Sequence, residues 1–234
     1  MKIDVLTLFP QMFSALNASI TGKAQKSGAV SLACHNLRNY AQDKHRTVDD
    51  SPFGGESGMV LKPEPLKAAL DSICEGKKPH IVFLTPQGTL FTQEKAKEFA
   101  KKEHLLLITG HYKGIDERIR EKYVDEEISI GDYVLTGGEL PAMVLIDSVS
   151  RLLPGIIGES METDSHFSEN LLGWPVYTRP EKFDGLEVPK VLLTGHHKNM
   201  EKWRKIEGLK RTKQNRPDLF KKLELPEQKL IRDS

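Results

Sequence analysis

The stretch 128–142, Ile-Ser-Ile-Gly-Asp-Tyr-Val-Leu-Thr-Gly-Gly-Glu-Leu-Pro-Ala, constrains the fold more than any other part of the chain. Its β-branched apolar run ends at Gly131, a short loop passes through Gly137-Gly138, and Glu139-Leu140-Pro141 has the composition of a helix start. The stretch therefore predicts a strand, a tight loop and a helix in direct succession.

Two earlier segments have the same form. Strands are expected at 80–85 and 105–109, and each is followed by a glycine-containing turn, 85–88 or 110–114. In an open α/β sheet, ligands bind beyond the carboxyl ends of the strands, and glycines let backbone atoms approach a ligand closely. We therefore expect the loops 85–88, 110–114 and 131–138 to converge on one small-molecule pocket. The alternative is that these glycines only end strands and begin helices.

The remaining elements complete an α/β pattern over residues 1–158. We expect further strands at 3–9 and 30–33, and helices at 11–16, 20–27, 64–74, 93–102, 116–122 and 140–153. Residues 39–63 are expected to form a long loop, and their mixture of charged residues and glycines suits substrate binding. The chain has no Walker loop and no Gly-x-Gly-x-x-Gly after a strand, which argues against nucleoside triphosphates and NAD.

Beyond residue 158 the character of the chain changes. Residues 159–173 begin with a polar stretch without helical or strand period, which predicts an interdomain linker. Residues 174–234 are expected to form a mainly α-helical domain, with helices at 198–214 and 217–223, a short tail helix, and Trp203 and Ile206 in its core. Residues 190–222 hold eleven Lys and Arg against three acids, so they could neutralise phosphates. The alternative is an ordinary solvated helical surface.

Several classes of protein are excluded. The amino-terminal apolar run is too short for a signal peptide and contains Asp4, and no 18 apolar residues run together, so we expect a cytoplasmic protein that does not interact with membranes. Cys34 and Cys74 are far apart, and no histidine has zinc-finger spacing. A disulfide framework is therefore not expected, and no metal site is proposed.

Several motifs together identify a family. They are Leu6-Thr-Leu-Phe-Pro10, Val48-Asp-Asp-x-Pro52, Gly110-His-Tyr112 with Gly114-Ile-Asp-Glu-Arg118, Ile128 to Glu139, Arg151-Leu-Leu-Pro-Gly155, Asp164-Ser165, Tyr177-Thr-Arg-Pro180 and Val188-Pro189. With these motifs the chain resembles, from end to end, the bacterial tRNA (guanine-N1)-methyltransferases of the SPOUT class, the TrmD family. Members methylate guanosine at position 37 of tRNA.

The resemblance implies features that composition and periodicity do not. It implies a parallel α/β sheet with a deep trefoil knot, a helical C-terminal domain that binds tRNA, and a homodimer whose active site is shared between subunits. It also implies that the knot loops bind S-adenosylmethionine. The residues carried over for this role are Leu84, Thr85, Pro86, Gly88, Gly110, Tyr112, Ile130, Gly131, Asp132, Tyr133, Val134, Leu135, Gly137, Gly138 and Pro141.

Methylation of guanine at N1 requires a base for the N1 proton and a cation or donor near O6, where negative charge develops. The resemblance assigns the base to Asp164 and the O6-stabilising group to Arg151. Without the resemblance, Asp164 is a linker acid or N-cap, and Arg151 a helix C-terminal cation. The resemblance further implies contacts to tRNA from His45, Asp49, Gly58, Ser165, His196, Lys198 and Arg204.

The chain departs from the family pattern at two positions. It has Lys113 where the family often has an acid, and Glu56 where the family has a third glycine, so the electrostatics around the cofactor or the guanine are expected to differ. Family members also use Mg2+, which rests on the resemblance alone. The competing hypotheses are a SPOUT methyltransferase acting on another tRNA or rRNA base, and a non-catalytic RNA-binding protein that retains the cofactor pocket.

Overall fold

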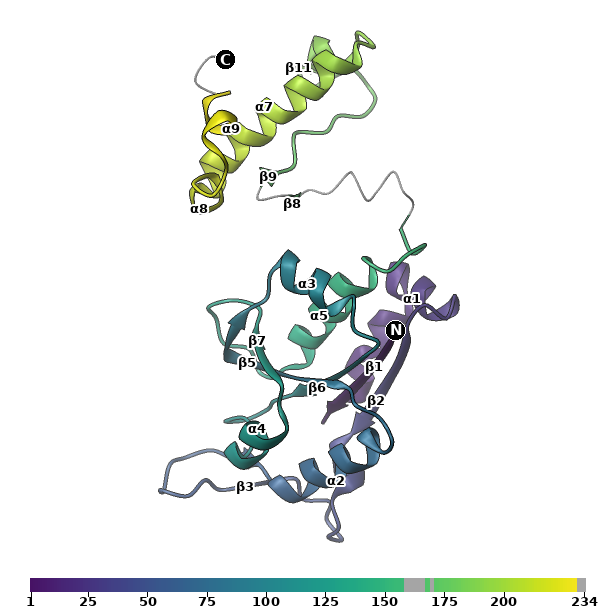
Figure 1. Cartoon of the computed structure of the whole chain (residues 1–234), viewed down its shortest axis with the longest axis vertical. Coiled ribbons are helices and arrows are strands. Elements are labelled where there is room, and N and C mark those ends of the chain that lie inside the picture. The colour runs from purple at the N-terminus through teal and green to yellow at the C-terminus, as the bar shows by residue number, and fades with distance from the viewer. Residues whose placement is uncertain (158–166, 169–170, 231–234) are drawn as a thin grey trace. The chain divides into compact units, whose positions relative to one another are not determined.

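The computed structural model describes residues 1–157, 167–168 and 171–230. The chain divides into two compact units, Met1–Ile157 and Gly158–Ser234 (Figure 1). The predicted linker falls mostly outside the described residues, as do Asp164 and Ser165.

The first unit is built on a five-stranded parallel sheet with the order β2-β1-β6-β5-β7. Its strands are β1 Lys2–Thr7, β2 Ser31–Asn36, β5 His80–Leu90, β6 His104–Thr109 and β7 Glu126–Ser129. Residues 105–108 of β6 have no exposed surface, because helices cover both faces of the sheet. The parallel α/β sheet is as expected; the trefoil knot stays a prediction.

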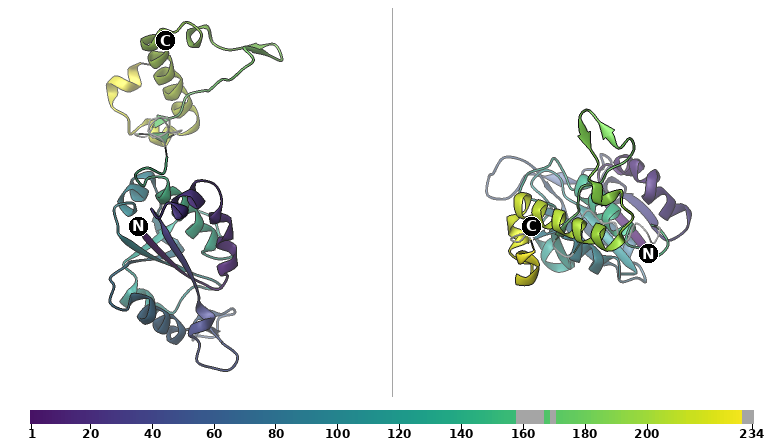
Figure 2. Two further views of the ribbon diagram at one scale, coloured as in Figure 1. Left: turned by 90° about the vertical axis from the view of Figure 1, so that its right-hand side faces the viewer. Right: turned by 90° about the horizontal axis from the view of Figure 1, so that it is seen from above.

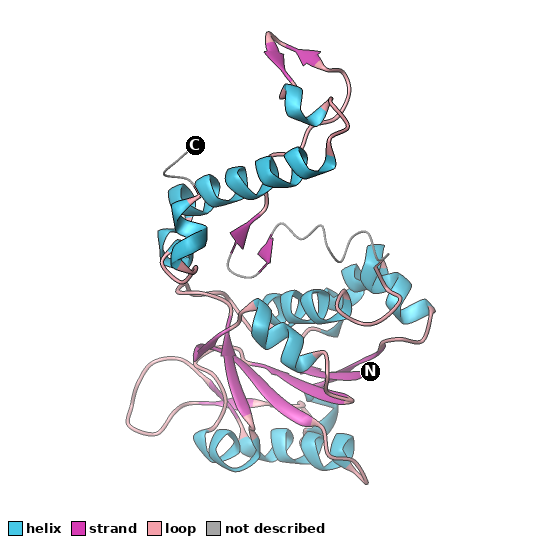
Figure 3. Ribbon diagram, turned by 45° about the horizontal axis from the view of Figure 1, so that its top comes forward, coloured by secondary structure: helices cyan, strands magenta, loops and turns pink. Residues whose placement is uncertain are grey.

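Helices lie on both faces of the sheet (Figures 2 and 3). Alternate residues of the strands pack against these two helical layers. Leu105 and Leu107 face one layer, and Leu106 and Ile108 face the other. The first layer contains the 3-10 helix η1 Pro10–Asn17 and the helices α1 Ser19–Lys26, α3 Gln93–Phe99 and α5 Glu139–Ser150. The second contains η2 Leu37–Tyr40, α2 Pro63–Cys74 and α4 Glu117–Tyr123.

Helix α5 is fixed to the sheet by a stripe of apolar side chains. Ala142, Leu145, Ile146 and Val149 are 0–1% exposed and recur at helical spacing. Burial of four such side chains stabilises the docked helix by several kcal/mol, at about 25 cal/mol per Å² of apolar surface. The amino-terminal end of α5 is thereby held at the edge of the sheet where the loops gather.

The expectation that β5 ends at residue 85 is wrong. Leu84 and Thr89 both pair with Ile128, so residues 85–88 bulge out of a strand that then continues to Leu90. The continuation is held by the bond from Phe91 N to Ser129 O, 2.7 Å. Pro86 lacks a backbone donor and favours the bulge, whereas Thr89 and Leu90 can resume pairing with β7.

Other boundaries also differ from expectation. The residues expected as the helix 11–16 form the 3-10 helix η1, and the strand expected at 30–33 extends to Asn36 because it pairs with β1 along its whole length. Residues 39–63 are not one continuous loop. They contain the short antiparallel strands β3 Asp49–Asp50 and β4 Val60–Leu61.

The second unit combines short hairpins with a long helix. Its elements are β8 Phe167–Ser168, β9 Leu171–Leu172, β10 Lys182–Phe183, β11 Leu186–Glu187, η3 Lys190–Leu192, α7 His197–Asn215, α8 Pro217–Phe220 and α9 Leu225–Lys229. Leu209 and Thr212 of α7 are fully buried, and Thr212 Oγ1 accepts a bond from Leu172 N at 2.9 Å. Trp203 and Ile206, expected in the core, are only half-buried. None of the described helices has the length and apolar character needed to cross a membrane.

Candidate active site

A cavity of about 380 Å³ lies where the 85–88 bulge of β5 meets the loops after β6 and β7. These strands are neighbours in the sheet, so their carboxyl ends share one edge, as the sequence pattern predicted. Of the fifteen residues proposed for cofactor binding, thirteen line the cavity: Leu84, Thr85, Pro86, Gly110, Tyr112, Ile130, Gly131, Tyr133, Val134, Leu135, Gly137, Gly138 and Pro141. Gly88 and Asp132 do not line it.

The loops 110–114 and 131–138 are joined directly. Gly138 N donates to Gly110 O at 2.8 Å, and His111 forms an antiparallel bridge with Gly137. A Cβ atom on Gly138 would lie 2.9 Å from Gly110 N, which is closer than real Cβ contacts allow. Glycine at 138 is therefore required for the approach of two backbone segments, in addition to any contact with a ligand.

The cavity wall formed by residues 130–135 is largely apolar and open. Tyr133, Val134 and Leu135 are 54%, 87% and 36% exposed. Tyr133 Oη donates to Ile130 O at 3.3 Å, and Gly131 N donates to Ser129 Oγ at 3.2 Å, so the loop is supported by its own bonds. Tyr112 on the facing loop has φ 57°, an uncommon conformation for a residue with a side chain. Such apolar surface beside a cavity is suited to an aromatic or aliphatic ligand.

A buried carboxylate anchors the start of α5 below these loops. Glu139 is 2% exposed, and its Oε1 accepts a bond from Thr7 Oγ1 at 2.8 Å and lies 3.0 Å from Thr109 Oγ1. The carboxylate also lies in the first turn of α5, where negative charge interacts favourably with the helix dipole. Glu139 therefore ties α5 to β1 and β6, and its role here is structural.

Charged residues also line the cavity: Lys113, on the predicted pocket loop 110–114, and Glu117 and Arg120 of α4, which lie outside the three predicted loops. Lys113 forms an ion pair with Glu56, and Arg120 bonds to Glu117 and to Glu127, with Nε 2.7 Å from Glu117 Oε2. The bonds to Glu117 and Glu127 raise the pKa of Arg120, and the bond from Lys113 lowers the pKa of Glu56. Glu117 and Arg120 are three residues apart, so the helical period of 116–122 could have indicated that they share a face.

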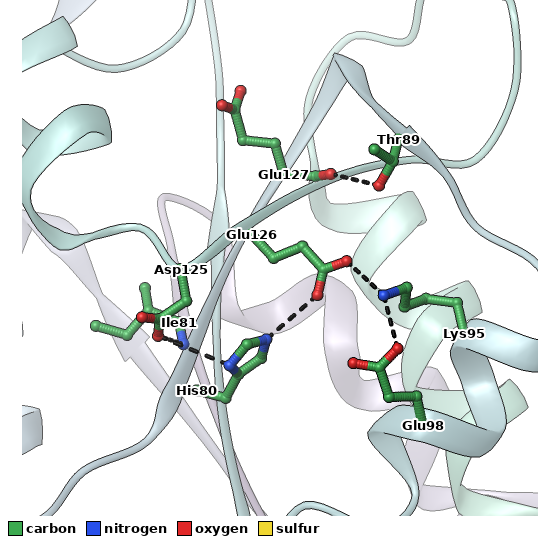
Figure 4. A network of polar contacts seen from close by, with 8 residues as sticks. All are labelled: His80, Ile81, Thr89, Lys95, Glu98, Asp125, Glu126 and Glu127. Atoms are coloured by element: carbon green, nitrogen blue, oxygen red, sulfur yellow. Dashed lines mark hydrogen bonds and ion pairs between the residues drawn. The ribbon is translucent and has the colours of Figure 1, made fainter.

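A polar network fixes β7, the strand that leads into the third loop (Figure 4). Ile81 N donates to Asp125 Oδ2 at 2.8 Å, and Thr89 Oγ1 donates to Glu127 O at 3.1 Å. Glu126 lies 3.3 Å from His80 Nε2 and 2.7 Å from Lys95 Nζ. The bonds to Glu126 and Glu98 raise the pKa of Lys95. The network thus attaches β7 to β5 and α3 from both sides.

Arg151, one of the two residues predicted to act in catalysis, lies away from this cavity within one chain. Arg151 is the exposed C-cap residue of α5, whereas the cavity contacts the opposite end of that helix at Gly138. Twelve helical residues at a rise of about 1.5 Å each separate the two ends by about 18 Å. Within one chain, Arg151 therefore does not reach the cavity. Asp164 lies outside the described residues.

The residues predicted to contact tRNA fall into two groups. In the first unit, Gly58 lies against Lys113, where an added Cβ would be 3.1 Å from Lys113 Cε; Asp49 is on β3, and His45 is exposed. In the second unit, His196 precedes α7 and is exposed like Lys198. Ser165 is outside the described residues.

Arg204 differs from the other predicted tRNA contacts. Its guanidinium lies 5.3 Å from the ring centroid of Trp174, and its Nε is buried without a hydrogen-bond partner among the described residues. This stacking gives Arg204 a packing role within the second unit.

Cys34 and Cys74 are free thiols, and burial raises the pKa of Cys34 to about 11. Within the described part of the chain, no group of three or more His, Cys, Asp or Glu side chains could hold a metal ion.

Comparison with known proteins gives a consistent result. Residues 1–222 match the family described as tRNA (Guanine-1)-methyltransferase TrmD. A tRNA (guanine-N(1)-)-methyltransferase of Ruminiclostridium cellulolyticum is 56% identical over 228 residues, which cover 95% of this chain and 97% of that protein. Proteins with the same description from Brevibacillus brevis and Halalkalibacterium halodurans are each 54% identical, over 97% and 99% of this chain and 95% and 96% of theirs.

Proposed function

This chain belongs to the TrmD family of tRNA (guanine-1)-methyltransferases, and from this premise we propose that it transfers a methyl group from S-adenosylmethionine to N1 of guanosine at position 37 of tRNA. The family match confirms the resemblance drawn from the sequence motifs. The cavity is the main support for this proposal, because the three segments that line it are those that the family resemblance assigns to the methyl donor.

The properties of the cavity fit this donor. Its volume of about 380 Å³ lies within the usual range for a small-molecule site, roughly 300–1,000 Å³. Backbone groups of Gly110, Gly131 and Gly137 line it, beside the apolar surface of Leu135 and Pro141. When bound, S-adenosylmethionine supplies a methyl group on a sulfonium, which needs no further activation by the protein. The residues of the chain then have to orient the donor and exclude water.

The protein must also manage a proton and a negative charge on guanine. We assign removal of the N1 proton to Asp164 and stabilisation of the charge at O6 to Arg151. An ordinary aspartate has a pKa of about 3.9 and is a weak base, so the assembled site has to raise that value or couple proton removal to methyl transfer. Assembly of the base only when tRNA docks would couple the chemistry to recognition of the correct substrate.

The position of Arg151 favours a homodimer with a shared active site. Because Arg151 is about 18 Å from the cavity along α5, a second copy has to bring its own Arg151 to that cavity. The exposed stripe of α5 that leads to Arg151 includes the apolar residues Leu140 and Val144, 49% and 45% exposed. Such a stripe is suited to an interface between copies.

We also assign the segment 130–138 to the trefoil knot.

Recognition of tRNA is assigned to two regions. The segment 45–58 ends beside the cavity-lining residue Lys113, whose side chain lies against Gly58, so this segment could contact the nucleotide that enters the site. The basic surface of α7, with exposed Lys198, Lys202 and Lys213, would neutralise backbone phosphates. Three other basic residues of this region, Lys205, Lys210 and Arg216, form ion pairs with Glu227, Glu207 and Asp218, which reduces their free positive charge.

The test is nucleoside mass spectrometry on tRNA incubated with the protein and S-adenosylmethionine. We expect N1-methylguanosine at position 37, and no product from a transcript carrying adenosine there. Asp164→Asn is expected to lower turnover by about 100-fold or more, with S-adenosylhomocysteine affinity nearly unchanged, since general-base catalysis contributes on that scale. Methylation of a different base would support another SPOUT activity, and absence of any methylation would support an RNA-binding protein.

A further inference from the structure

Lys113 is a cation at the cavity whose present partner comes from a distant loop. The residue lines the cavity beside Tyr112, and its ammonium group forms an ion pair with the carboxylate of Glu56. Glu56 does not itself line the cavity, and its side chain is 75% exposed, against 36% for Lys113. The pair therefore stands at the boundary between cavity and solvent, where a ligand could replace one partner.

The other two basic residues that line the cavity, Arg120 and His111, already interact with neighbouring side chains. Arg120 bonds to Glu117 on its own helix and to Glu127 on β7, which leaves its guanidinium held from two sides. The ring of His111 packs between Phe9 and Tyr112, with centroid distances of 5.2 and 5.1 Å. Among the basic residues that line the cavity in the described structure, Lys113 is the one with a single, mostly exposed partner.

The attachment of the loop that carries Glu56 is uneven. At its carboxyl end, Lys113 N donates to Met59 O, Leu61 N donates to Gly114 O, and Asp116 N donates to Leu61 O, each at 3.0 Å. Residues 53–58 are exposed, and Gly54, Gly55 and Gly58 have φ values of 94°, 77° and 103°. The loop base is thus fixed to the cavity wall, while Glu56 can leave Lys113 without breaking these backbone bonds.

We propose that Lys113 binds the carboxylate of the methyl donor's methionine moiety, and that this carboxylate displaces Glu56. The inference rests on the proposed function, which supplies a ligand with a carboxylate. In the structure, the Glu56 carboxylate stands in for that group: it already satisfies the same ammonium with the same chemistry. Lys113 is then a positioning residue for the donor, and donor binding frees residues 53–58.

The experiment compares two ligands by calorimetry: S-adenosylhomocysteine, and its decarboxylated analogue, which keeps the amine but lacks the carboxylate. Lys113→Ala is expected to weaken the binding of S-adenosylhomocysteine about fivefold to tenfold, because it removes a partly exposed charge-assisted bond. The affinity for the analogue is expected to stay unchanged. Lys122→Ala removes the same charge from the exposed surface of α4, outside the cavity lining, and is expected to leave both affinities unchanged.

Glu56→Gln provides an independent test in the opposite direction. Because the competing carboxylate is removed, S-adenosylhomocysteine is expected to bind about twofold to fivefold tighter, and the gain should disappear when Lys113→Ala is added. Equal affinity of wild-type protein for the two ligands would overturn the inference while leaving the proposed function intact. So would a Lys113→Ala variant with unchanged cofactor affinity and a raised KM for tRNA, which would place the ammonium on a tRNA phosphate. Failure of wild-type protein to bind S-adenosylhomocysteine would contradict the proposed function itself.

Discussion

At the scale of single residues, Asp4 is a buried carboxylate that lies outside the cavity. Its side chain is 1% exposed and lies 2.7 Å from each of three cationic or ionisable partners, Lys2 Nζ, His35 Nε2 and His104 Nε2. Burial disfavours the ionised form, but the bonds from His35, Lys2 and His104 outweigh it and hold the pKa of Asp4 well below its usual range. A charge this well paired joins β1 to both neighbouring strands.

We expect Asp4→Asn to destabilise the protein by about 2 kcal/mol at pH 7, the usual scale for hydrogen bonds to a buried charge. Because the folded-state pKa is lowered, the contribution is present above the unfolded-state pKa near 3.8 and is lost as pH falls below it. Urea unfolding of wild type and variant at pH 7 and pH 3 measures both effects. Asp71→Asn, which breaks an exposed ion pair with Lys67, serves as the control and should cost less than about 0.5 kcal/mol. Equal losses from the two variants would contradict this role.

At the scale of elements, the bulge in β5 decides where the first cavity loop lies. Residues 85–88 leave the ladder between Leu84 and Thr89, and Gly88 brings the chain back against β7. A Cβ on Gly88 would lie 2.5 Å from Glu127 C and closer still to Ile128 N, both backbone atoms. Any side chain at position 88 therefore separates β5 from β7.

Gly88→Ala is expected to destabilise the first unit by about 1–3 kcal/mol, the usual cost of forcing extra atoms into a packed site, and to weaken S-adenosylhomocysteine binding. Thermal unfolding and calorimetry measure the two effects. Gly28→Asn is the control, because Gly28 has open space around its Cβ position and a φ of 77° that asparagine tolerates. A Gly88→Ala variant as stable as the control would show that β5 and β7 can separate without cost.

Most of the helices and strands could be predicted from the sequence, and the exceptions have physical causes. Apolar runs such as 105–109 predict buried strands because parallel strands are covered on both faces. The sequence predicts a strand end at the 85–88 bulge, since a turn and a bulge use the same residue types and only the partner strand distinguishes them. The short strands β3 and β4 were missed because two residues carry no period.

At the scale of the whole molecule, some residues of the candidate site could be predicted from the sequence and others could not. Spacing alone predicts that three loops gather, because parallel strand ends share an edge, and one of these loops, 110–114, carries Lys113. Arg120 lies on helix α4, and its helical period does not place it in the cavity. Resemblance supplied Arg151, and the structure places it at the far end of α5 from the cavity. A catalytic role for Arg151 thus makes a prediction about assembly: the cavity of one subunit works with Arg151 of the other.

Complementation between two inactive variants tests this prediction. Ile130→Trp fills the cavity of one chain, and Arg151→Ala removes the cation from another. Each variant alone is expected to be inactive. In a heterodimer isolated with two affinity tags, one cavity remains intact and faces an intact Arg151, so activity should return to about half that of wild type. A randomly mixed population, of which half is heterodimer, should show roughly a quarter. If cavity and Arg151 instead acted within the same chain, no pairing of these variants would contain a complete site, and the purified heterodimer would be as inactive as its parents.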